Sequence, residues 1–210
     1  EDTDGDGLGN PGSESEECVS GDRELPQVGE YYQGGYVFYT NESEGYVLIG
    51  SSHNFGGGGW GCKGTAIPGA DGEGYGDGQQ NTADILAGCT SSSQALVAST
   101  FESEGYDDWY IPSKDELLLM NEALGFGSID NVLNFSPGAN YWSSTEVNAD
   151  NAWALRTFSS GSSSWSEKDK NNTPPFKAVR TAYFSGVADL VLDCSDEYPD
   201  CSANEFDCNG

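Results

Sequence analysis

The sequence contains little positive charge, with 8 Lys plus Arg among 210 residues and a single His. A nucleic-acid binder needs a basic face to release counterions from phosphate, and an anionic membrane surface attracts the same sign of charge. The composition therefore argues against both partners. The chain also lacks any run near the roughly 20 apolar residues that span a bilayer, which argues against membrane insertion.

Catalytic motifs are missing as well. The single histidine, His53, has no Cys or Ser motif around it, and neither GxSxG nor HExxH occurs. Carboxylate pairs such as Asp107-Asp108 are abundant in so acidic a chain, and they indicate a glycosidase only when their geometry is known. The sequence therefore predicts a protein that is not an enzyme.

Negative charge is abundant, with 35 Asp plus Glu and a net charge of −27. The excess is about −9 over residues 1–30 and about −7 over residues 189–210, so the two ends are the most acidic parts. Because the 36% apolar content suffices for one core, we predict a domain over residues 31–188 between two acidic, Cys-containing arms. The chain begins at Glu1, and we expect a processed chain or a fragment of a longer protein.

The N-terminal arm carries carboxylates at alternate positions, Asp2, Asp4 and Asp6, followed by Gly7. This pattern can wrap oxygen ligands around Ca²⁺. We predict that the three side chains and the Leu8 carbonyl bind Ca²⁺, with a later carboxylate completing the site. The segment resembles the Asp-rich calcium-binding repeats of the thrombospondin type 3 kind, which link modules of secreted surface proteins. A solvated acidic linker without metal is the alternative.

Six cysteines divide among the three regions, with Cys62 and Cys89 in the middle one. Their spacing is not that of a zinc site, and no CxxC pair occurs. Disulfides in an oxidising, extracellular compartment are therefore expected, although the spacing does not fix their connectivity. Cys62 with Cys89 is the preferred pair. Buried free thiols in a cytosolic protein are the alternative.

Hydrophobic patterning predicts an α+β domain with two or three helices and antiparallel strands. Residues 36–39 and 46–50 alternate as a β-hairpin does, and Ser113 with Glu116 forms a capping box that begins a helix ending near Gly125. Other predicted helices cover residues 80–88 and 94–101, with Ile85, Leu86, Leu96 and Val97 buried. Later strands are predicted over residues 141–145, 152–158, 163–167 and 176–184.

Several blocks resemble the Lcl C-terminal domain family of bacterial surface adhesins, over roughly residues 30–185. These blocks are Gly105–Leu117, Tyr141–Glu146, Ala152-Trp153 and Val179-Arg180, together with Trp60–Cys62, Gly78–Thr82 and Cys89. The resemblance implies a C-type-lectin-like domain on secreted or surface proteins, appended to longer adhesive chains. The Glu-Pro-Asn and Trp-Asn-Asp motifs of calcium-dependent sugar binding are absent.

The function expected from the sequence is adhesion or ligand binding at a cell surface, with a glycan or protein ligand and neighbouring modules of the same chain as partners. Polar and aromatic residues gather between residues 146 and 172, as they do in binding loops. A structural segment of a long extracellular fibre is the alternative. The predicted ligand-binding residues are Trp165, Asn151, Ser163 and Asn171, and a protein ligand would also cover Tyr141 and Lys168 at the rim.

Overall fold

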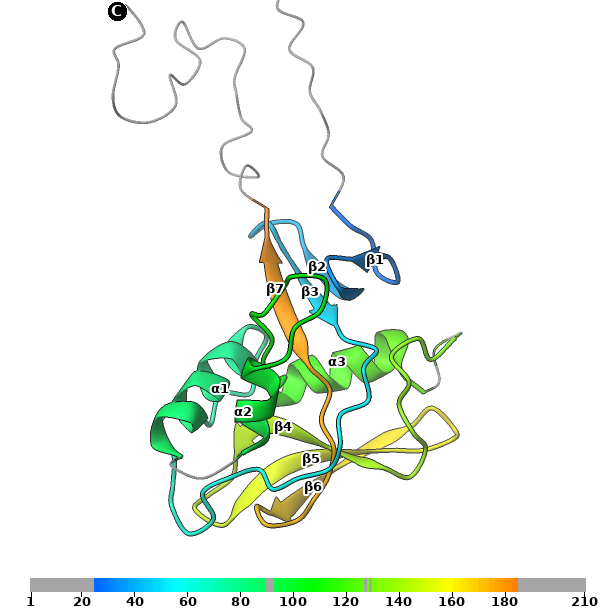
Figure 1. Ribbon diagram of the computed structural model, residues 1–210. Coiled ribbons are helices and arrows are strands. Elements are labelled where there is room, and N and C mark those ends of the chain that lie inside the picture. Colours follow the sequence, from blue (N-terminus) through cyan, green and yellow to red (C-terminus); the bar gives the residue numbers. More distant parts are fainter. Residues whose placement is uncertain (1–24, 90–92, 127, 129, 185–210) are drawn as a thin grey trace, which may run out of the picture. The chain divides into compact units, whose positions relative to one another are not determined.

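The computed structural model describes residues 25–89, 93–126, 128 and 130–184, which form one compact unit (Figure 1). The predicted calcium ligands Asp2, Asp4, Asp6 and Leu8 lie outside these residues. The strands are β1 (Tyr31–Tyr32), β2 (Gly35–Asn41), β3 (Tyr46–Gly50), β4 (Asn140–Glu146), β5 (Asn151–Thr157), β6 (Ser163–Asp169) and β7 (Val179–Tyr183). The helices are α1 (Asp77–Gly88), α2 (Gln94–Ser99) and α3 (Lys114–Leu124).

Two antiparallel sheets carry the fold, and with the three helices they confirm the α+β class. The first sheet has the strand order β1-β2-β3-β7, and the second has the order β4-β5-β6. Every residue of β3 is buried, because its two faces contact two different core clusters. Val47 and Ile49 face one cluster, whereas Tyr46 and Leu48 face the other. Both faces of β3, one strand of the predicted hairpin, therefore pack against core residues.

Helix α3 joins the two sheets. Leu117, Met120 and Leu124 recur at helical spacing and are buried in the same cluster as Leu48 of β3 and Leu155 of β5. The predicted capping box is present: the Ser113 hydroxyl accepts from the Glu116 amide, and the Glu116 carboxylate accepts from the Ser113 amide. This start fixes the direction of α3 across the second sheet.

Helix α2 differs from the prediction on its buried face. Ala95 and Ala98 are fully buried, whereas Leu96 and Val97 are 47% and 46% exposed. The helix has only six residues and presents its small side chains to the core, which lets its backbone lie close to its neighbours. Burial of Leu96 and Val97 was therefore a wrong prediction.

Both ends of the unit lie beside the turn between β2 and β3 (Figure 1). The Thr40 hydroxyl donates to the Pro26 carbonyl at 3.0 Å, and the Phe184 amide donates to the Gly45 carbonyl at 2.7 Å. The second sheet lies at the opposite end of the unit. The unit therefore presents that end away from the points where the chain enters and leaves it.

Candidate functional site

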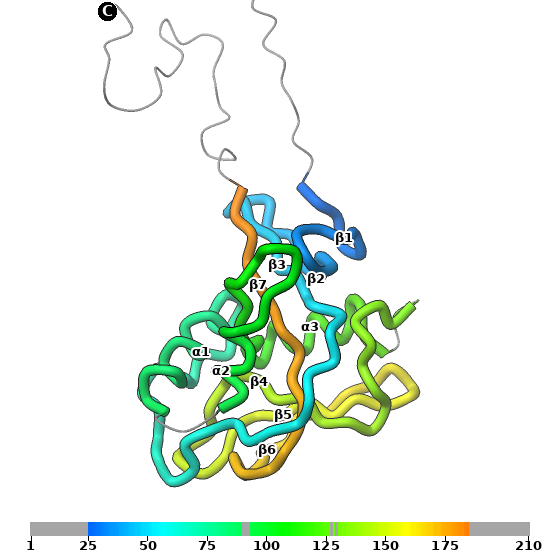
Figure 2. Tube along the Cα trace, viewed as in Figure 1, coloured from blue at the N-terminus to red at the C-terminus, as the bar shows by residue number. Residues whose placement is uncertain are grey.

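A glycine-rich segment, residues 54–64, crosses the end of the unit that carries the second sheet. Figure 2 shows this part of the chain running beside the segment that leads from β6 into β7. Backbone bonds join the two: the Gly58 amide donates to the Pro174 carbonyl at 3.3 Å, and the Trp60 amide donates to the Lys170 carbonyl at 2.9 Å. The backbone of residues 170–174 thereby helps to hold an irregular loop in place.

Two buried tryptophans anchor the same segment. The Trp60 indole donates to the Ser143 carbonyl, and the Trp142 indole donates to the Gly58 carbonyl, each at 2.9 Å. The predicted disulfide is present, and it joins Cys62 to Cys89 at the end of α1, with 5.4 Å between their Cα atoms. Burial of the two large anchors and the covalent link thus offset the conformational entropy that the glycines of this loop lose on folding.

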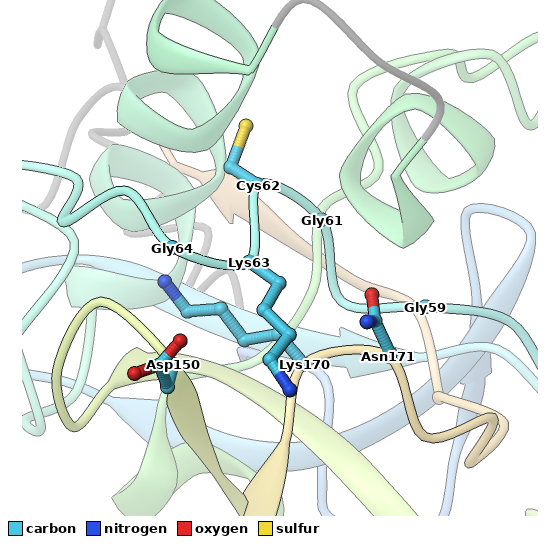
Figure 3. A pocket seen from close by; sticks show the side chains of 8 residues that line it. All are labelled: Gly59, Gly61, Cys62, Lys63, Gly64, Asp150, Lys170 and Asn171. Atoms are coloured by element: carbon cyan, nitrogen blue, oxygen red, sulfur yellow. The ribbon is translucent and has the colours of Figure 1, made fainter.

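A polar pocket of about 560 Å³ lies between this segment and the loops that flank β5 and β6 (Figure 3). We refer to it as the polar pocket. Its lining residues are Gly59, Gly61, Cys62, Lys63, Gly64, Asp150, Lys170 and Asn171.

The two lysines of the polar pocket are both paired. Lys63 forms an ion pair with Asp169, and this hydrogen bond raises the pKa of Lys63 and lowers the pKa of Asp169. The Lys170 side chain is fully buried, where it pairs with Glu146, donates to the Thr65 carbonyl at 3.1 Å and lies 4.6 Å from the Trp60 ring centroid. The lysines therefore hold loops together and leave little free positive charge in the pocket.

Asp150 and Asn171 supply the free polar groups. Both are exposed, and neither side chain is hydrogen-bonded to another described residue, while their backbone amides are fixed by turns. The Asp150 amide donates to the Asn148 side chain, and the Asn171 amide donates to the Asp169 carboxylate, each at 2.9 Å. Figure 3 shows the two side chains on opposite sides of the lysines. A carboxylate and a carboxamide on a rigid frame can accept and donate hydrogen bonds to hydroxyl groups.

The predicted ligand-binding residues do not form one cluster. Asn151 pairs with Asp169 at the pocket end of the β5–β6 ladder, whereas Ser163 pairs with Thr157 at the other end, about 20 Å away. Tyr141 is 3% exposed, and its hydroxyl accepts from the Ser136 amide. Its expected place at the rim was therefore wrong, because the ring fills the core.

Trp165 lies midway along β6, between the two ends of the β5–β6 ladder, and is half-buried. Its ring meets Trp153 edge to face at 6.4 Å, and the Lys114 ammonium lies 4.6 Å from the Trp153 centroid and 5.9 Å from that of Trp165. Glu73 pairs with Lys114 at 3.0 Å. Trp165 is thus held in one orientation by its neighbours while part of its surface stays in contact with solvent.

The sequence did not single out Lys63 or Asp150 as pocket residues. Lys63 follows Cys62, whose disulfide fixes the loop, and Asp150 lies in a turn formed by Asn148. The run Asn148-Ala149-Asp150-Asn151 is rich in turn-forming residues, and this signal could have placed Asp150 in a turn. Lys63 reaches the pocket through its ion pair with Asp169, which lies 106 residues later in the chain. No local sequence pattern predicts a contact between residues so far apart.

The part of the chain that the structure describes contains neither a cluster of potential metal ligands nor a helix that could cross a membrane. There, no three His, Cys, Asp or Glu side chains are grouped so that they could hold a metal ion. Among the same residues, no helix is both long and apolar enough to cross a bilayer.

The fold and pocket define an α+β domain whose polar site is built on loops at one end. No known protein family and no curated protein matches the sequence. Among solved structures, the fold is similar to that of a fimbrial protein from Bacteroides ovatus ATCC 8483, with a TM-score of 0.50 and 18% sequence identity. The similarity covers 65% of this chain and 36% of the fimbrial protein, and at this identity it concerns the fold alone.

Proposed function

We propose that this chain is a non-enzymatic ligand-binding module of an extracellular surface or filament protein. The observation that carries the proposal is the polar pocket, where the Asp150 and Asn171 side chains bond no other described residue, at the end of the unit opposite Leu25 and Phe184. A module attached at one end presents the other to a ligand. The fimbrial protein with a similar fold supports a place among surface proteins, as does the resemblance to the C-type-lectin-like Lcl family.

A hydroxyl-rich glycan suits the pocket best among ligand classes. Asp150 can accept hydrogen bonds from sugar hydroxyls, and Asn171 can both donate and accept. Trp165 shares a strand face with Asp169 and lies about 13 Å from it along β6, so a ligand that reaches both must be an oligosaccharide. A ring stacked on Trp165 would add apolar contact to the hydrogen bonds at the pocket.

The test is a glycan array followed by calorimetry on the bound glycans. Asp150→Asn replaces the acceptor with an isosteric amide, and we expect it and Asn171→Ala each to weaken binding about tenfold or more. Trp165→Ala should weaken the binding of oligosaccharides and leave that of monosaccharides unchanged. The matched control is Asp107→Asn, an exposed carboxylate outside the pocket, which should leave the affinity unchanged.

The alternative is a structural segment of a fibre, which the similarity to a fimbrial protein favours. A chain with no affinity for any arrayed glycan would support that alternative. The neighbouring ends of the unit count against a spacer, because such a module adds little length between the segments on either side of it. Equal affinity of wild type and Asp150→Asn for a bound glycan would show that the polar pocket does not bind the glycan.

A further inference from the structure

Two basic side chains, Lys168 on β6 and Arg156 on β5, have no carboxylate partner among the described residues. The other described basic side chains are paired with carboxylates or, for the last of them, buried: Lys63, Lys114, Lys170, Arg180 and Lys177. In a chain whose net charge is −27, these two cations are the groups that remain able to bind an external anion.

Both cations lie on one face of the second sheet. Lys168 is opposite Ala152 in the β5–β6 ladder, and Arg156 is four residues from Ala152 along β5. Because side chains at even spacing point to the same face, Lys168 and Arg156 share a face. Asn140 of β4 is opposite Arg156 and belongs to it as well. The acidic residues next to Lys168 on β6, Glu167 and Asp169, alternate onto the other face.

A pocket of about 410 Å³ lies beside Lys168, and we refer to it as the Lys168 pocket. Its lining residues are Ala139, Asn140, Lys168, Asn172, Thr173, Pro174 and Pro175. No acidic residue lines it, and none occurs in residues 131–140 or 170–176. An ammonium group with carboxamides and a hydroxyl in an acid-free pocket provides hydrogen-bond donors that suit a carboxylate.

The chain itself contains an acidic segment of matching chemistry. Residues 185–210, the acidic tail, have 7 acidic residues and no Lys, Arg or His. Asp196, Glu197 and Asp200 place three carboxylates within six residues. The N-terminal arm is acidic too, but its alternate carboxylates are predicted to hold Ca²⁺, and it includes Arg23.

The position of Phe184 favours the tail of a neighbouring copy. Phe184 lies at the end of the unit opposite the second sheet, on which the Lys168 pocket is built (Figure 1). The residues from Phe184 to Asp196 span about 40 Å when fully extended, which is roughly the width of a compact unit of this size. A chain's own tail would have to be fully extended to reach the pocket, whereas the tail of a second copy has no such constraint.

We propose that the Lys168 pocket binds the acidic tail of a second copy of this chain, with carboxylates of Ser195–Asp200 at Lys168 and Arg156. The contact is head-to-tail, so it can repeat from copy to copy along a filament. The charge of −27 on each copy opposes association, but at about 0.15 M salt charges more than about 8 Å apart are largely screened. The Lys168 pocket shares no lining residue with the polar pocket, and this contact goes beyond the ligand binding proposed there.

The test is self-association of the full chain, followed by sedimentation velocity over a range of protein concentrations. We expect reversible association at about 0.15 M salt that weakens at roughly 0.5 M. Lys168→Gln removes the ammonium group and should weaken association about tenfold, as should Arg156→Gln, whereas Lys168→Arg should preserve it. The matched control is Gln79→Glu, an exposed site on α1 outside the pocket, which changes the net charge by the same amount and should associate as wild type does.

A tail peptide tests the contact directly. Acetyl-Ser-Asp-Glu-Tyr-Pro-Asp-amide, which corresponds to residues 195–200, is titrated into the ¹⁵N-labelled full chain and followed by NMR. We expect saturable shifts at the side-chain amides of Asn140 and Asn172. The same peptide with Asp196→Asn, Glu197→Gln and Asp200→Asn keeps its shape and loses its charge, and it should give no shifts.

A chain that stays monomeric at every concentration would overturn the proposal, and so would equal association of wild type and Lys168→Gln. Peptide binding without self-association would place each tail in its own pocket and would overturn the contact between copies. Stronger shifts with methyl β-glucuronoside than with the peptide would assign the pocket to an acidic sugar instead. If Lys168→Gln lowers the thermal midpoint, Arg156→Gln carries the comparison. Asp150→Asn should leave association unchanged, so this result is separate from the function proposed for the polar pocket.

Discussion

Among the described residues, three Lys and Glu side chains are at most 1% exposed, and each is stabilised in a different way. Lys170 pairs with Glu146, whereas Lys177 pairs with no described carboxylate and donates to Asn54 Oδ1 at 3.0 Å, with the Phe135 ring centroid 5.4 Å away. Burial lowers the pKa of Lys177 to about 8. Glu116 accepts from the Ser113 and Gly76 amides, each at 2.8 Å. The cap motif predicted the role of Glu116, but no local pattern indicates a buried lysine, because lysine is usually exposed.

Glu116 should make the stability of the domain depend on pH. Burial raises the pKa of Glu116 from 4.5 to about 7, so the folded state binds a proton more tightly than the unfolded state. Its contribution to stability is full below about pH 4.5 and is lost as the pH rises through 7. Chemical denaturation should show the free energy of unfolding falling by roughly 2 kcal/mol between pH 5 and 7.5 from this group.

Glu116→Gln should remove this part of the pH dependence, and the exposed Glu122→Gln on the same helix should preserve it. The lowered pKa of Lys177 acts in a higher range: its contribution is full above 10.5 and is lost as the pH falls through about 8. Parallel stability curves for wild type and Glu116→Gln from pH 5 to 7.5 would show that Glu116 has no raised pKa.

The elements were predicted better than the packing between them. Period-two runs and the capping box gave the β2–β3 hairpin and α3 at nearly their observed bounds. Helix α2 was placed correctly with its buried face wrong, because a six-residue helix is too short for its apolar side chains to define a face. The polar pocket was missed for a similar reason, since it joins loops about 90 to 110 residues apart.

The disulfide between Cys62 and Cys89 ties the glycine-rich segment to the end of α1. Cys62 and Cys89 are separated by 27 residues, and closing such a loop stabilises the folded state by roughly 3 kcal/mol in the chain-entropy account. Cys62→Ser with Cys89→Ser should lower the free energy of unfolding by about that amount and speed amide exchange over residues 56–64. An unchanged free energy of unfolding in the double variant would contradict the account.

At the scale of the whole molecule, the sequence predicts an acidic chain with one core. It does not predict which residues far apart in the chain contact each other, and the structure shows these contacts. The sequence alone does not say which carboxylate Arg180 contacts, and Asp107, Asp108 and Glu116 are all candidates. The structure selects Asp108, which accepts from Nε at 2.6 Å and from Nη2 at 3.0 Å, while Gln33 accepts from Nη1 at 2.6 Å. This contact ties β7 to the loop before α3 and to the start of the first sheet.

The net charge of −27 attracts cations to the whole chain, so a test of the predicted calcium site must separate it from this diffuse attraction. Close carboxylates repel unless a cation or water screens them, so Asp2, Asp4 and Asp6 with the Leu8 carbonyl should bind Ca²⁺ more tightly than the remaining acidic surface does. Calorimetry should give a saturable isotherm for wild type at 0.15 M salt, where diffuse attraction is screened. Asp4→Ala should abolish it, and Asp193→Ala in the acidic tail should preserve it. Identical isotherms for wild type and Asp4→Ala would mean that calcium responds only to overall charge.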